Sequence, residues 1–136
     1  MKELKPNRKV AFTISLPPRT KKNHGRIITN PKTGKPMYIP SKEYKDYEHD
    51  AAWFMPHTET VREPVNIRAQ FYMPTHRRVD LVNLEQALLD ILVKYDVIED
   101  DNSQIVASMD GSRVMYDREE PRTEVIIEWV GEDDDR

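Results

Sequence analysis

The sequence predicts an α+β domain in which a mixed β-sheet packs against two main helices. Three observations carry this prediction: apolar residues alternate in several short segments, two segments have helical composition, and turn signals separate them. A chain of 136 residues is long enough for one domain with its own core. We therefore expect a single domain over residues 1–136, with residues 1–8 and 131–136 as frayed tails.

The first half of the chain is expected to form a strand, a small hairpin and a helix. Residues 9–16 alternate in hydropathy and end at a pair of prolines, which is typical of a strand. Residues 26–29 and 36–39 flank a turn signal, Asn-Pro-Lys-Thr-Gly, and predict a hairpin. Ser41 is a favourable N-cap residue and predicts a helix over residues 42–55 that ends before Pro56.

The second half adds one strand, the other main helix and three more strands. Residues 65–73 alternate strictly and predict a strand, and residues 81–95 contain no Gly or Pro and predict a helix. Within this helix Glu85 falls among the apolar positions. Residues 104–109 and 113–116 predict two strands joined by a hairpin turn at Asp110-Gly111, and residues 123–130 predict the last strand.

Composition excludes several classes of protein. The absence of cysteine excludes a disulfide framework, cysteine-based zinc fingers and thiol catalysis. No apolar stretch reaches the ~20 residues of a membrane span, and the N-terminus is too charged for a signal peptide. The four histidines lack zinc-ligand spacing, and no phosphate-binding loop or dinucleotide fingerprint predicts a nucleotide cofactor. We expect a cytoplasmic protein that does not bind membranes.

Charge is distributed unevenly along the chain. The overall net charge is −3, but residues 17–47 carry eight basic and two acidic side chains, a net charge of +6. Residues 117–136 carry nine acidic and three basic side chains, a net charge of −6. A polyanion responds to the local field, so the basic segment is compatible with nucleic acid binding. The alternative is that the two ends neutralise each other across a solvated surface.

Three acids stand at the ends of predicted elements. Asp80 precedes the second helix, and Asp100 and Asp101 follow it. If the chain after the helix turned back along it, these carboxylates would approach one another and would need a cation between them. Mg²⁺ prefers carboxylate and water oxygens. Each acid also has an ordinary role, because Asp80 suits an N-cap and Asp100 and Asp101 suit a turn.

The motif Arg-Arg-Val-Asp-Leu-Val-Asn-Leu at residues 77–84, followed by Asp-Asp-Asn at residues 100–102, resembles the signature of the RusA family of Holliday junction resolvases. The Leu-Pro-Pro at residues 16–18 and Lys-Lys-Asn at residues 21–23 resemble the start of that family's domain. The resemblance implies a crossover junction endodeoxyribonuclease, common in phages and prophages, that acts in recombination or repair. It implies a homodimer that nicks four-way DNA junctions in paired symmetric positions with Mg²⁺, for which Mn²⁺ could substitute.

The resemblance also implies roles for particular residues. Asp80 and Asp101 are the expected metal ligands and catalytic residues, with Asp100 in support and Asn83 orienting Asp80. Basic residues are expected to contact DNA phosphates, which position the DNA without reading its sequence. The residues expected to bind DNA are Lys21, Lys22, Asn23, Arg26, Arg77 and Arg78.

Two positions depart from the family pattern. Val82 stands where a second aspartate is expected, and Gln86 stands where a lysine is expected. Glu85 is the nearer of two possible replacements for the missing carboxylate, because Asp90 lies two turns farther along the helix.

These departures leave a second hypothesis, a non-catalytic protein that binds branched DNA with a decayed active site. A third hypothesis, a protein-interaction domain that uses the acidic tail at residues 132–135, has little support, because short acidic tails are usually only solvated ends.

Overall fold

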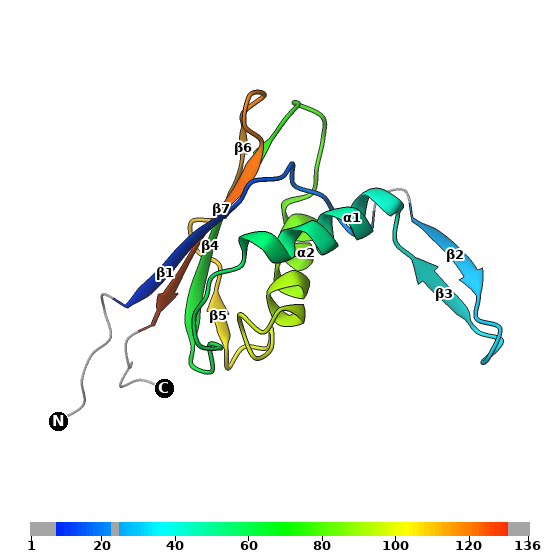
Figure 1. The fold of residues 1–136 in the computed structure, drawn as a ribbon, viewed down its shortest axis with the longest axis horizontal. Coiled ribbons are helices and arrows are strands. Elements are labelled where there is room, and N and C mark those ends of the chain that lie inside the picture. Colours follow the sequence, from blue (N-terminus) through cyan, green and yellow to red (C-terminus); the bar gives the residue numbers. More distant parts are fainter. Residues whose placement is uncertain (1–7, 23–24, 131–136) are drawn as a thin grey trace.

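The computed structural model describes residues 8–22 and 25–130, which form one α+β domain with two helices and a mixed sheet (Figure 1). Its elements are strands β1 (Lys9–Ile14), β2 (Arg26–Thr29) and β3 (Pro36–Ile39), helix α1 (Lys42–Ala51), the 3₁₀ turn η1 (Ala52–Phe54), strand β4 (Val65–Met73), helix α2 (Leu81–Lys94), and strands β5 (Val106–Ser108), β6 (Arg113–Tyr116) and β7 (Arg122–Trp129). The predicted fold class is confirmed, and the helix and strand boundaries are close to those expected from the sequence.

The main sheet has five strands, with β1, β7, β4 and β5 side by side and β6 also paired with β4. Antiparallel pairing joins β7 to both β1 and β4, whereas β5 and β6 run parallel to β4. Strand β4, helix α2 and strand β5 therefore form a β-α-β unit. In such a unit the helix begins near the C-terminal end of the first strand and returns the chain to the N-terminal end of the second, parallel strand.

The core lies between the sheet and the two helices, which cover the same side of it (Figure 1). Alternate residues of β4 and β7 are buried, as their period-2 hydropathy predicts. Helix α2 contributes six buried side chains: Leu84, Ala87, Leu88, Leu89, Ile91 and Leu92. This broad apolar face anchors α2 in the core.

The predicted hairpin at Asp110-Gly111 is wrong. Strands β5 and β6 do not pair with each other but follow one another along the same edge of β4. Between them Gly111 has a φ of +85°, and the Ser112 hydroxyl accepts a hydrogen bond from the Ala69 amide at 3.0 Å. The Gln70 side-chain amide donates to the Gly111 carbonyl at 2.8 Å, so β4 holds the irregular segment in place.

The predicted hairpin of β2 and β3 is confirmed and projects from the body of the domain (Figure 1). At the other end of the described chain, Arg8 belongs to the segment expected to fray. Its carbonyl accepts from the Trp129 amide at 3.1 Å, and its guanidinium lies 4.2 Å from the centre of the Trp129 ring. None of the helices in the described ranges is long and apolar enough to cross a membrane.

Adjacent residues of β7 test the assignment of its two faces. Ile127 is fully buried, whereas Ile126 is half-buried on the other side of the sheet. We expect Ile127→Ala to lower the free energy of unfolding by about 2–5 kcal/mol, because it leaves a cavity in the core. The matched variant Ile126→Ala should cost less than about 1.5 kcal/mol in urea denaturation. Equal losses in the two variants would contradict this packing.

Candidate active site at the ends of helix α2

Asp80 caps the N-terminus of α2. Its backbone is extended, and its carboxylate accepts a hydrogen bond from the Val82 amide at 3.0 Å. The side chain is exposed, so one carboxylate can cap the helix and still face solvent. The structure shows no hydrogen bond between the side chains of Asn83 and Asp80, both of which it describes, so the expected orienting role of Asn83 stays a prediction.

Asp100 and Asp101 lie in the turn beyond the C-terminus of α2. The Val97 amide donates to the Leu92 carbonyl at 2.8 Å, and the Glu99 amide donates to the Val61 carbonyl at 2.9 Å. These bonds hold the chain at the end of the helix. The Asp100 carboxylate accepts from the Asp101 amide at 2.8 Å and from the Asn102 side chain at 3.2 Å. Asp100 therefore shapes the turn, and Asp101 is exposed.

Within one chain the three acids do not meet. The 14 residues of α2 span about 21 Å at 1.5 Å per residue, and the segments before and after α2 lie at opposite ends of it (Figure 1). Among residues 8–22 and 25–130 no three His, Cys, Asp or Glu side chains are close enough to hold a metal ion. The expectation that the chain after the helix turns back to bring Asp80 to Asp100 and Asp101 is therefore wrong. A single chain does not provide a divalent-metal site from these acids.

Polar residues on α2 form a second feature between its two ends. The Gln86 side-chain amide donates to the Asp90 carboxylate at 3.0 Å, and the Lys21 ammonium lies 3.6 Å from the same carboxylate. Asp90 is thus engaged by two neighbours. Glu85 is half-buried, and burial raises the pKa of its carboxyl above the usual value. Val82, in the place of an expected aspartate, leaves 67% of its side chain exposed.

The basic residues predicted to bind DNA come from two segments. The Lys21 carbonyl accepts from the Tyr38 hydroxyl at 2.8 Å, which ties the end of the first loop to strand β3. Lys22, Arg26, Arg77 and Arg78 are exposed. Asn23 lies outside the described residues. The structure does not test whether any of these residues contacts DNA.

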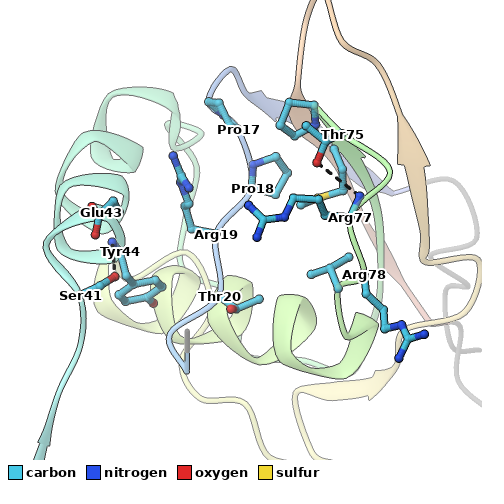
Figure 2. A pocket seen from close by; sticks show the side chains of 13 residues that line it. Pro17, Pro18, Arg19, Thr20, Ser41, Glu43, Tyr44, Thr75, Arg77 and Arg78 are labelled. Atoms are coloured by element: carbon cyan, nitrogen blue, oxygen red, sulfur yellow. Dashed lines mark hydrogen bonds between the residues drawn. The ribbon is translucent and has the colours of Figure 1, made fainter. Parts of the chain in front are cut away.

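A hollow of about 390 Å³ adjoins the start of α2 and was not predicted from the sequence (Figure 2). Segment 17–20, the first turn of α1 and segment 73–79 line it, and the last of these leads directly to Asp80. Arg19 and Thr20 belong to this lining and had no predicted role. The basic charge of segment 17–47 is the one sequence feature that points toward this hollow, because the three lining segments are far apart along the chain.

Comparison with known proteins identifies a family for most of the chain. A family model described as endodeoxyribonuclease RusA matches residues 15–128, which include Asp80, helix α2, the turn with Asp100 and Asp101, and the residues that line the hollow. No curated protein matches the sequence. The resemblance inferred from the two acidic motifs is confirmed by the family match.

The half-buried carboxyl of Glu85 should make stability depend on pH. Because the pKa of Glu85 is raised in the folded state, its ionised form costs stability at pH values above its ordinary value of 4.5. We expect Glu85→Gln to be more stable than the unmodified protein at pH 7, and the difference to vanish below about pH 4. Urea denaturation at both pH values measures this, with exposed Glu59→Gln as the control. A constant difference across the pH range would contradict the assignment.

Proposed function

The chain belongs to the RusA endodeoxyribonuclease family, and we propose that it is a Mg²⁺-dependent endonuclease that resolves four-way DNA junctions by paired symmetric nicks. The observation that carries this proposal is the family match across Asp80 and Asp100-Asp101, at the two ends of one packed helix. The basic side chains near Asp80 supply the field that a nucleic acid backbone requires.

We further propose that a homodimer completes the active site. A packed helix cannot bend to bring its two ends together, so Asp80 must find its partners on a second chain. Two α2 helices that pack antiparallel about a twofold axis would bring Asp80 to Asp101 of the partner subunit, twice in each dimer. The exposed side chain of Val82 offers apolar surface to such a contact. Two equivalent sites match the twofold symmetry that paired nicks require.

The proposed site suits a hard divalent cation. Asp80 and the partner's Asp101 would hold it, with the partner's Asp100 in support, and Mn²⁺ is expected to substitute for Mg²⁺. When bound, the cation polarises the scissile phosphate and lowers the pKa of a coordinated water. Arg77 and Arg78, three and two residues before Asp80, would bind adjacent phosphates and hold the strand in position.

Neutral variants of the two acids test the proposal. We expect Asp80→Asn and Asp101→Asn each to slow nicking of a synthetic four-way junction by at least about a hundredfold, roughly 2.7 kcal/mol of lost transition-state stabilisation. Junction binding should persist in both, because asparagine still caps α2 and the basic side chains are unchanged. Band shifts in EDTA measure binding, and product gels with Mg²⁺ measure nicking.

The control is Asp96→Asn, which removes an exposed acid at the same end of α2 as Asp101. Its backbone has a φ of +58°, a conformation that asparagine tolerates well. We expect it to nick at the unmodified rate. If the unmodified protein binds junctions without nicking them, the hypothesis of a decayed site replaces the proposed nuclease. Loss of binding together with nicking would show instead that the acids hold the fold.

A further inference from the structure

The hollow beside the start of α2 has the size and wall chemistry of a ligand pocket. Its volume of about 390 Å³ falls in the range of small-molecule sites, about 300–1,000 Å³, and is far too small to admit a duplex. Four apolar residues contribute to its lining, Pro17 and Pro18 from one segment and Met73 and Pro74 from another, and they are called its apolar wall below. Such a wall can cover the flat face of a base.

Two guanidinium groups extend over this wall. Arg19 rises between α1 and Pro18, and Arg77 points from the opposite side toward Pro18, whereas the Arg78 side chain extends away from the hollow (Figure 2). Within the described ranges neither Arg19 nor Arg77 forms an ion pair with an acid. By contrast, Arg122 is paired with both Asp117 and Glu124. Two uncompensated guanidiniums in one concavity favour an anionic ligand.

Two further features of the lining support an anion. The Thr20 hydroxyl is buried and has no hydrogen-bond partner among the described residues, so its hydrogen-bonding capacity is unused. The N-terminus of α1, capped by Ser41, also lines the hollow and adds the positive end of a ten-residue helix. The single acid of the lining is Glu43, which opposes the two guanidiniums only in part.

We infer that this hollow binds one unpaired nucleotide, with the base against the proline and methionine wall and the phosphate between Arg19 and Arg77. The inference rests on the proposed function for the assignment of the ligand to the DNA substrate. Val79, which lines the hollow, immediately precedes Asp80. A nucleotide held there would fix the next phosphodiester of the same strand near Asp80. The enzyme would then select DNA whose strands can unpair, as at the centre of a junction.

Binding of short single strands in EDTA tests the inference without any cleavage. The probes are fluorescent pentathymidylate and a pentamer of abasic units with the same phosphates. We expect pentathymidylate to bind at least about fivefold more tightly, because stacking of one base contributes about 1–3 kcal/mol by alanine substitution. Equal affinities would overturn the inference, since they would show a site for phosphate alone.

Variants of the lining locate the site. Arg19→Gln should weaken the binding of both probes, because it removes a phosphate contact that both make, and should lower the salt dependence of binding by about 0.7 per lost phosphate contact. The control Arg68→Gln, on the opposite face of the sheet, should change affinity less than twofold. Glu43→Gln should strengthen binding, an effect that misfolding cannot produce.

An unchanged affinity and salt dependence in Arg19→Gln, or weaker binding in Glu43→Gln, would overturn the inference. These outcomes do not depend on junction nicking. Failure of the proposed nuclease activity and failure of the nucleotide site are therefore distinguishable.

Discussion

The packing of α2 into the core determines where the acidic residues of the candidate site can lie. Buried leucine and isoleucine side chains between Leu84 and Leu92 fix the helix in the core, so Asp80 and the turn with Asp100 and Asp101 stay at opposite ends of a helix about 21 Å long. The parallel pairing of β4 and β5 has the same effect, because the chain must return from the C-terminal end of β4 to the N-terminal end of β5. Any site that uses both Asp80 and Asp101 must therefore use two chains. The proposed homodimer follows from this geometry as much as from the symmetry of a junction.

Ion pairs within the fold explain how an acidic protein can offer a cationic surface. Glu99 and Glu48 pair with Arg62 and Lys94 away from the hollow. At the start of β7, a hydrogen bond from Arg122 holds the pKa of the Asp117 carboxyl below its usual value. These acids are neutralised locally by basic partners. Arg19 and Arg77, which have no such partner among the described residues, can act on a ligand. The local field near Asp80 therefore matters more than the net charge of −3.

The sequence predicted features whose signals are local. Strand β4 alternates strictly, Ser41 and Asp80 cap the two helices, and the β2–β3 hairpin surrounds an unambiguous turn. The hairpin predicted at Asp110-Gly111 was wrong because this dipeptide fits either a hairpin turn or an irregular segment. The pairing of both β5 and β6 with β4 decides for the irregular segment. The separation of Asp80 from Asp100 and Asp101 depends on β5 running parallel to β4, and the hollow forms only where three distant segments meet. No local sequence pattern predicts either feature.

Mixing two inactive variants measures most directly whether the site lies between chains. Asp80→Asn and Asp101→Asn are unfolded together and refolded at equal concentration, so that half of the dimers contain one chain of each kind. In such a dimer one site carries both substitutions and the other carries none, so about a quarter of the unmodified nicking activity should return. A mixture as inactive as either variant alone, with mixed dimers shown to be present, would contradict a site shared between two subunits.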